Sequence, residues 1–206
     1  MHRQIPAVSS VTLLAAVAAL TTPAYGRDPN MNLIDVDQKR AVEKSVDELT
    51  VATAAQAATT NKAVVTLVRN QHSTASVRGF TLVQDEPASV AGGATGPTPT
   101  DFFVTALGTC QNVVFVRFAA LEQMAIAALE TTVTGSWDRR GLYGLAGVDP
   151  GFREITIETR VSTSAPVDKV AEVARRTRAG CPIFATLRKE TQLAVRLIVN
   201  GQLVPL

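Results

Sequence analysis

Apolar residues dominate one long stretch of the chain, residues 98–129, and this stretch predicts a central helix. From Phe102 onward its only charged residues are Arg117 and Glu122, a pattern typical of a helix buried inside a domain. Polar residues interrupt the run too often for a membrane-spanning helix, which needs about 20 predominantly apolar residues. We therefore expect a core helix with the remaining elements packed around it.

The start of this helix is marked by the sequence Thr98-Pro99-Thr100-Asp101. Thr98 can serve as the N-cap, and Pro99 fits the first helical position, where its missing N–H costs no hydrogen bond. The carboxylate of Asp101 can reach back to the cap and complete a capping box. A structural role is therefore available to Asp101 from the sequence alone.

Shorter patterns predict strands on both sides of the central helix, and hence an α+β fold. Runs rich in β-branched residues at 64–69 and 77–83 flank the turn-like sequence Asn70-Gln71-His72-Ser73 and predict a hairpin. Apolar and polar residues alternate at 131–137 and 154–163, as half-buried strands require. Residues 139–152 between them are rich in glycine and proline and predict a loop.

Further helices are expected at residues 33–58, where charged residues mark a solvated face, and at 164–178. The glycine- and proline-rich loop at 88–98 lacks the patterns of a phosphate-binding loop. The chain closes with residues 192–206, in which Asn200-Gly201 predicts a tight turn.

The first 26 residues have the pattern of a secretory signal. A basic start is followed by an apolar core at residues 11–20, too short to span a membrane, and by the small-residue cleavage site Ala24-Tyr25-Gly26. We expect an exported, periplasmic protein whose mature chain begins at Arg27 and has no membrane span. The alternative is that Met31 is the true start of a cytoplasmic protein. Behind the signal, residues 27–61 form a helical segment and residues 62–206 form one domain.

Composition narrows the function classes. The net charge is only +2, with 18% charged and 5% aromatic residues, so the composition lacks the excess of basic and aromatic residues typical of nucleic-acid-binding proteins. The two histidines and two cysteines lie in unrelated places, so the sequence indicates neither a zinc site nor a bound cofactor. Two cysteines are too few for a disulfide-rich scaffold, which leaves one structural bridge or redox chemistry.

The two cysteines lie in different settings. Cys110 falls in the middle of the apolar helix, where an inert buried thiol is the simplest interpretation. Cys181 lies in Gly180-Cys181-Pro182, directly after a predicted helix. Because Gly and Pro are helix-stop residues, we expect Cys181 at an accessible junction between elements.

Several motifs occur in the order found in one family. They are Asp85-Glu86-Pro87 with Gly92-Gly93, then Gly96-Pro97-Thr98-Pro99 leading into Ala106-Leu107-Gly108-Thr109-Cys110, then Gly147-Val148-Asp149-Pro150-Gly151-Phe152, and finally Cys181-Pro182. Over residues 62–199 the chain resembles the OsmC/Ohr family of thiol-dependent peroxidases, and in particular its OsmC-like branch.

The resemblance implies an intertwined homodimer of the OsmC-like α+β fold, with antiparallel sheets packed around the central helix. It assigns Cys110 as the peroxidatic cysteine and Cys181 as the resolving cysteine. It also implies reduction of organic hydroperoxides, with electrons from a dithiol of lipoyl type or from a small thiol. An arginine of the first sheet contacts the reactive sulfur in this family, and Arg78 is our candidate, with Arg69 as the alternative.

The sequence departs from the family at one position. Members usually carry a glutamate just after the proline that opens the central helix, whereas this chain has Thr100-Asp101. Nine residues of ideal helix separate Asp101 from Cys110 by about 13 Å and half a turn, so the two cannot touch within one straight helix. Either the helix bends near Gly108, or Asp101 serves a site shared between subunits, or it is only the cap. We predict the shared site.

Peroxide reduction needs a thiolate, a cation that keeps it ionised and a second thiol that captures the sulfenic acid. Cys110, an arginine and Cys181 would supply these groups. Phenylalanines of the central helix would suit alkyl or lipid hydroperoxides, although most of them are expected in the core. The competing hypothesis is a non-catalytic exported binding or structural protein of the same fold, in which the two cysteines form a permanent disulfide.

Overall fold

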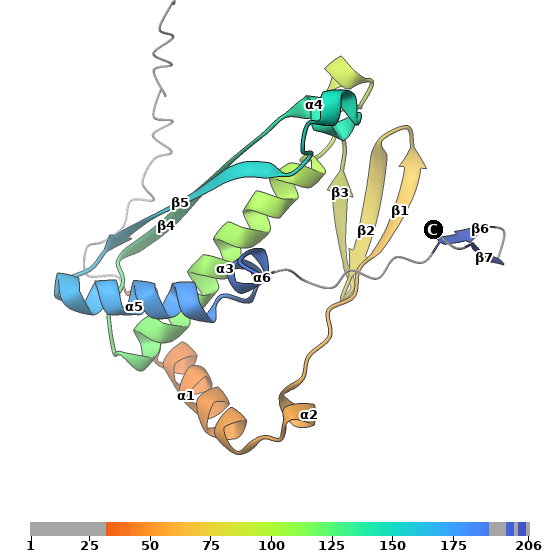
Figure 1. Ribbon diagram of the computed structural model, residues 1–206. Coiled ribbons are helices and arrows are strands. Elements are labelled where there is room, and N and C mark those ends of the chain that lie inside the picture. The colour runs from red at the N-terminus through yellow and green to blue at the C-terminus, as the bar shows by residue number, and fades with distance from the viewer. Residues whose placement is uncertain (1–31, 190–196, 200–201, 205–206) are drawn as a thin grey trace, which may run out of the picture.

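A long helix, α3 (Pro99–Leu121), runs through the centre of the molecule, and a two-stranded antiparallel sheet lies alongside it (Figure 1). The computed structural model describes residues 32–189, 197–199 and 202–204. The strands of this sheet are β4 (Ala128–Trp137) and β5 (Phe152–Ser162), paired from Ala128 opposite Ser162. The predicted α+β class and the predicted strands on the C-terminal side of the central helix are confirmed.

The remaining elements follow the chain from α1 to β7. In order they are α1 (Val36–Val51), α2 (Ala54–Ala57), β1 (Val64–Arg69), β2 (His72–Val77), β3 (Phe80–Gln84), the 3-10 turn η1 (Ala88–Val90), α4 (Arg139–Leu142), the 3-10 turn η2 (Leu145–Gly147), α5 (Val167–Gly180), α6 (Pro182–Leu187), β6 (Leu197–Val199) and β7 (Gln202–Val204). The strands β6 and β7 pair antiparallel, while the predicted Asn200-Gly201 turn between them lies outside the described residues.

Helix α3 begins as predicted but ends earlier. Thr98 is the N-cap and forms both halves of a capping box with Asp101. The expected extension to residue 129 is wrong, because the chain reverses at Gln123, whose φ of 53° is left-handed. Apolar residues continue beyond that point because the connection to β4 is itself buried, with Met124 only 3% exposed. An apolar run of this kind does not distinguish a helix from a helix followed by a buried turn.

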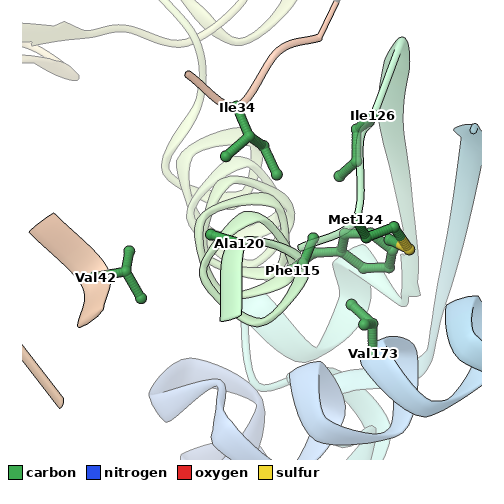
Figure 2. Close-up of a cluster of buried hydrophobic side chains, with 8 residues drawn as sticks. Ile34, Val42, Phe115, Ala120, Met124, Ile126 and Val173 are labelled. Atoms are coloured by element: carbon green, nitrogen blue, oxygen red, sulfur yellow. The ribbon is translucent and has the colours of Figure 1, made fainter. Parts of the chain in front are cut away.

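The core lies where α1, α3 and α5 meet the start of β4 (Figure 2). Its buried apolar side chains are Ile34, Val42, Phe115, Ala119, Ala120, Met124, Ile126 and Val173. Burying a side chain of this size stabilises the fold by about 1.5–3 kcal/mol. The predicted 33–58 helix is divided, because α1 ends at Val51 and α2 begins at Ala54 behind its own capping box at Thr53.

The described chain begins with a segment that is tied to this core. The Asn32 side chain accepts the backbone N–H groups of Ile34, at 3.1 Å, and of Ile126, at 3.0 Å. The Leu33 N–H donates to the Ile126 carbonyl at 2.8 Å. Residues 32–34 are therefore an integral part of the domain.

By length and composition alone, α3 could cross a membrane, since its most apolar window has a mean hydropathy of 1.4. The core helix of a soluble protein passes the same test. Here α3 packs against α1, β4 and α5. No other helix in the described ranges is long and apolar enough to meet the criterion.

The N-terminal sheet has three strands in the order β1-β2-β3, where the sequence predicted two. The expected strand at 77–83 is wrong, because β2 ends at Val77 and the chain turns at Arg78 and Gly79, whose φ angles are 52° and 85°. Two successive residues with positive φ are typical of a type I′ hairpin turn. Strand β2 was missed because its small polar residues, from His72 to Ser76, have the composition of a loop.

This three-stranded sheet stands apart from the helices (Figure 1). Its large apolar side chains are between 43% and 69% exposed: Val64, Val65, Leu67, Val68, Phe80 and Leu82. Exposed apolar patches of this kind mark surfaces that contact another molecule. The sheet therefore lacks a covering layer within the described part of its own chain.

Asp85 organises the loop between β3 and α3. Its side chain is almost fully buried and accepts the backbone N–H groups of Glu86, Gly93 and Thr95 and the Thr95 hydroxyl, at 2.8–3.2 Å. The loop passes so close that a Cβ on Gly92 would lie 1.8 Å from the Glu86 carbonyl oxygen. These hydrogen bonds hold the pKa of Asp85 well below its usual range, against the effect of burial.

We predict that Asp85→Asn lowers the melting temperature at pH 7 by about 5–10 °C, because an amide cannot accept all of these N–H groups. A carboxyl whose folded-state pKa is depressed contributes its full stability above the ordinary value, about pH 4, and loses it as the pH falls further. The difference between variant and wild type should therefore shrink between about pH 4 and pH 2.

Thermal denaturation followed by circular dichroism measures this difference. Asp37→Asn is the matched control, because the Asp37 side chain is 86% exposed and its nearest ion pair is a long 3.6 Å. If the difference in melting temperature between wild type and Asp85→Asn stayed constant from pH 7 to about pH 2, the role assigned to Asp85 would be contradicted.

Candidate thiol site

The two cysteines meet in space although 71 residues separate them in sequence, and their sulfur atoms lie 3.0 Å apart. Both are free thiols. Cys110 lies in the middle of α3 and is half-buried, whereas Cys181 is fully buried. Two thiols in such contact can exchange a proton or form a disulfide after a small movement.

Cys181 occupies the junction between α5 and α6. It ends α5 through its N–H bond to the Thr177 carbonyl, and its sulfur accepts the Phe184 N–H at 3.5 Å, so it also caps α6. The predicted junction is confirmed, but the predicted accessibility is wrong, because Cys181 is 0% exposed. The short helix α6, which the sequence did not reveal, turns the chain back over the sulfur.

Gly180 allows α5 to approach α3 closely enough for the sulfurs to meet. A Cβ at this position would lie 3.1 Å from the Phe118 ring. Beside it, Arg176 lies over the Phe118 ring at 4.4 Å and donates to Glu122 at 2.6 Å. The end of α5 is thus fixed on α3 by packing, a cation–π contact and an ion pair.

The surroundings of Cys110 act on its ionisation in opposite directions. Burial, followed by the contact with Cys181, raises the pKa of the Cys110 thiol above its ordinary value. The backbone N–H of Ile183 and the charge of Arg117 lower that pKa, but they do not outweigh burial. A single chain therefore holds Cys110 mainly as the protonated thiol at neutral pH.

Arg117 is the residue that sequence reasoning missed. It follows Cys110 by seven positions, which places both side chains on one face of α3 two turns apart. The seven-residue spacing between Cys110 and Arg117 on a predicted helix is the sequence signal that identifies this arginine.

Neither strand arginine reaches the thiols within this chain. Arg78 is exposed in the β2–β3 turn, not on a strand as expected, and the cause is its left-handed φ of 52°. Arg69 ends β1 and is also exposed. Both belong to the sheet that stands apart from α3 (Figure 1).

Asp101 is engaged in the helix cap. Its carboxylate accepts the Thr98 N–H at 2.9 Å and the Thr98 hydroxyl at 2.7 Å. These bonds lower the pKa of Asp101. Asp101 and Cys110 are not brought together, and the part of the chain described here shows no arginine bonded to Asp101.

The phenylalanines of α3 belong mainly to the packing. Phe115 is in the core (Figure 2). Phe103 stacks on Phe152 with ring centroids 5.2 Å apart. Gln111, next to Cys110, is only 7% exposed and its Nε2 has no hydrogen-bond partner among the described residues. Within the same ranges, no group of three His, Cys, Asp or Glu side chains could hold a metal ion.

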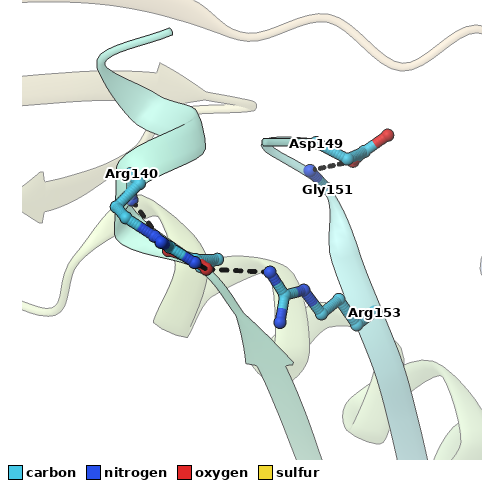
Figure 3. Close-up of polar contacts among 5 residues, drawn as sticks. Arg140, Asp149, Gly151 and Arg153 are labelled. Carbon is cyan, nitrogen blue, oxygen red and sulfur yellow. Dashed lines mark hydrogen bonds and ion pairs between the residues drawn. The ribbon is translucent and has the colours of Figure 1, made fainter. Parts of the chain in front are cut away.

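A second polar cluster lies on the loop between β4 and β5 (Figure 3). Arg140 and Arg153 both donate to Asp138, at 2.6 Å and 2.8 Å, and Asp149 accepts the Gly151 N–H at 2.6 Å. Gly141 lets this loop fold on itself, since a Cβ there would lie 2.6 Å from Pro150. The cluster closes the loop that contains the Gly147–Phe152 motif, and it contains neither thiol.

A family model, described as OsmC-like protein, matches residues 92–196, which is half of the chain and includes both cysteines. The chain belongs to the OsmC-like protein family. Its predicted family is therefore confirmed. A search of curated proteins gives no significant match.

Solved structures of the OsmC-like fold are similar to this chain. An OsmC-like protein from Mycoplasma pneumoniae is 21% identical, with a TM-score of 0.55, over 63% of this chain and 88% of its own. An organic hydroperoxide resistance protein OsmC from Legionella pneumophila is 16% identical, with a TM-score of 0.50, over 64% and 91%. One from Elizabethkingia anophelis, also named an organic hydroperoxide resistance protein, is 10% identical, with a TM-score of 0.51, over 65% and 91%. At these identities the likeness establishes the fold alone.

The two roles considered for Asp101 make opposite predictions for Asp101→Asn. Because Oδ2 of its carboxylate accepts both cap hydrogen bonds, we now expect a stability cost of at most about 1 kcal/mol and an unchanged rate of Cys110 oxidation. A catalytic role in a site shared between subunits would instead slow that oxidation by about one or two orders of magnitude, since an amide no longer holds a guanidinium.

Stopped-flow oxidation with cumene hydroperoxide, together with a urea denaturation midpoint, separates the two roles. Thr98→Ala is the matched control, because it removes the other half of the capping box and leaves the carboxylate in place. A slow Asp101→Asn beside a normal Thr98→Ala would restore the shared-site role.

Proposed function

We propose that this OsmC-like protein is a thiol-dependent peroxidase that reduces organic hydroperoxides. The observation that supports this best is the 3.0 Å contact between a half-buried thiol and a fully buried one. A peroxide can approach the half-buried Cys110 from solvent, whereas the buried Cys181 is not accessible to the oxidant. The names of the hydroperoxide resistance proteins that share the fold point the same way.

The reaction follows from this arrangement. The Cys110 thiolate attacks the distal oxygen of the hydroperoxide, the O–O bond breaks, and the alkoxide leaves as an alcohol after taking a proton. Cys110 is then a sulfenic acid. Cys181 attacks its sulfur, the S–S bond forms and water leaves. A dithiol of lipoyl type or a small thiol reduces the disulfide by two thiol–disulfide exchange steps and is itself oxidised.

The buried position of Cys181 protects the enzyme against overoxidation. Cys181 already touches the sulfur that becomes a sulfenic acid, so disulfide formation needs no large rearrangement. A second peroxide molecule must approach from solvent to reach the same sulfur. The geometry therefore favours the reversible disulfide over the irreversible sulfinic acid.

A homodimer is part of the proposal. The sheet β1–β3 exposes apolar side chains. Within the described residues it stands apart from the helices (Figure 1). We propose that a second copy covers this sheet and that, in this assembly, Arg78 of one subunit contacts the thiol of the other. Sedimentation at micromolar concentration tests this assembly.

Export remains a proposal as well, because residues 1–26 lie outside the described residues. Cleavage before Arg27 would leave the Asn32–Ile126 hydrogen bonds intact. The N-terminal sequence of the mature protein distinguishes this start from Met31.

The competing function is a binding or structural protein in which Cys110 and Cys181 form a permanent disulfide. The raised pKa of Cys110 and the full burial of Cys181 favour this alternative. Structural disulfides resist mild reductants, whereas catalytic ones have higher potentials and are readily reduced. Equilibration with dithiol redox buffers therefore distinguishes the two functions.

We predict that Cys110→Ser abolishes hydroperoxide turnover, while Cys181→Ser allows one round of Cys110 oxidation and then stops. The reason is that only Cys110 is open to solvent, and only Cys181 touches it. Single-turnover kinetics with cumene hydroperoxide, followed by a sulfenic acid probe, measures both steps.

Serine at position 181 keeps a good N-cap for α6, so this variant should fold. Circular dichroism of each variant is the control. If both substitutions abolished the first oxidation equally, the assignment of roles to the two cysteines would be wrong.

A further inference from the structure

Cys110 and Arg117 form a stripe along one face of α3. Seven residues of helix turn through about 700°, so the two side chains leave the helix in nearly the same direction, with about 10.5 Å of rise between them. Helical side chains tilt toward the N-terminus, and Cys110 is on the N-terminal side of Arg117. An arginine side chain that follows this tilt extends along the stripe toward the sulfur.

The guanidinium of Arg117 is available to interact with the Cys110 sulfur. It is exposed, and no carboxylate pairs with it in the described part of the chain. Glu122, the nearest carboxylate along α3, is held by Arg176 at 2.6 Å. Neither an ion pair nor burial among the described residues ties Arg117 to the stability of the fold.

We infer that Arg117 stabilises the Cys110 thiolate from within the same helix and so sets the reactivity of this thiol. The inference rests on the proposed peroxidase function and deepens it, because it names a group whose charge lowers the pKa of the nucleophile and so increases its thiolate fraction. It does not depend on the partner subunit. Arg117 acts through charge, as a positioning residue for the reactive state of the thiol and not as a reacting group.

The groups that face Cys110 agree with this role. From the α5–α6 junction come the Cys181 thiol and the Ile183 N–H, and from α3 comes the charge of Arg117, which lowers the pKa of Cys110. The nearby guanidinium groups of Arg178 and Arg188 lie over the Phe184 ring, at 5.6 Å and 5.9 Å. Among the described residues, Arg117 is the arginine whose charge is found to lower the pKa of Cys110.

The test is the rate at which iodoacetamide alkylates Cys110 as a function of pH. Iodoacetamide is neutral and reacts with the thiolate, so the rate reports ionisation without any peroxide. The parent is the full chain with Cys181→Ser, which leaves one thiol. In this parent we expect Arg117→Gln to slow alkylation at pH 7 by roughly three- to tenfold and to move the pH profile to higher pH.

Arg117→Lys should restore most of the rate, because it keeps the charge. High salt should reduce the difference between parent and Arg117→Gln, since the arginine is exposed. Arg139→Gln is the matched control: Arg139 is an exposed arginine on α4, and this change should leave the profile unaltered. Circular dichroism verifies that each variant is folded.

Superimposable profiles for the parent and Arg117→Gln would overturn the inference. So would a loss of rate in Arg78→Gln without a loss in Arg117→Gln, because that result would assign the charge to the strand arginine. If alkylation depends on Arg117 but hydroperoxides are not turned over, the inference stands and the proposed peroxidase function fails.

Discussion

The close approach of α5 to α3 at Gly180 is the constraint on which the thiol site depends. A Cβ at this position would lie 3.1 Å from the Phe118 ring, closer than an ordinary contact, and the next residue, Cys181, has its sulfur 3.0 Å from that of Cys110. Arg176, Phe118 and Glu122 fix the same crossing from the side. The packing of α5 on α3 therefore places the α5–α6 junction, with Cys181, against Cys110.

The same packing creates a conflict between protection and reactivity. Burial keeps Cys181 from solvent and in contact with its partner, but it also raises the pKa of the Cys110 thiol. A nucleophilic thiol at neutral pH requires positive charge that compensates for this burial. Arg117 supplies such charge from within the chain.

The sequence predicted those features that depend on local signals. The capping box at Thr98 and Asp101 marked the start of α3, and alternating residues marked β4 and β5. The sequence did not predict features that depend on tertiary contacts. The end of α3 at Leu121 and the burial of Cys181 both depend on packing between distant segments. Arg78 was placed on a strand because positive φ angles at a two-residue turn leave little trace in composition when only one of the residues is glycine.

The central claim is that Cys110 and Cys181 form a redox-active pair. The most direct test is to treat the fully reduced wild-type protein with one equivalent of cumene hydroperoxide and to determine the product by peptide mass spectrometry. We predict loss of two hydrogens per chain, a disulfide-linked peptide pair containing Cys110 and Cys181, and full reversal by a dithiol. Two unreacted thiols, or a sulfinic acid at Cys110 without a disulfide, would contradict the account.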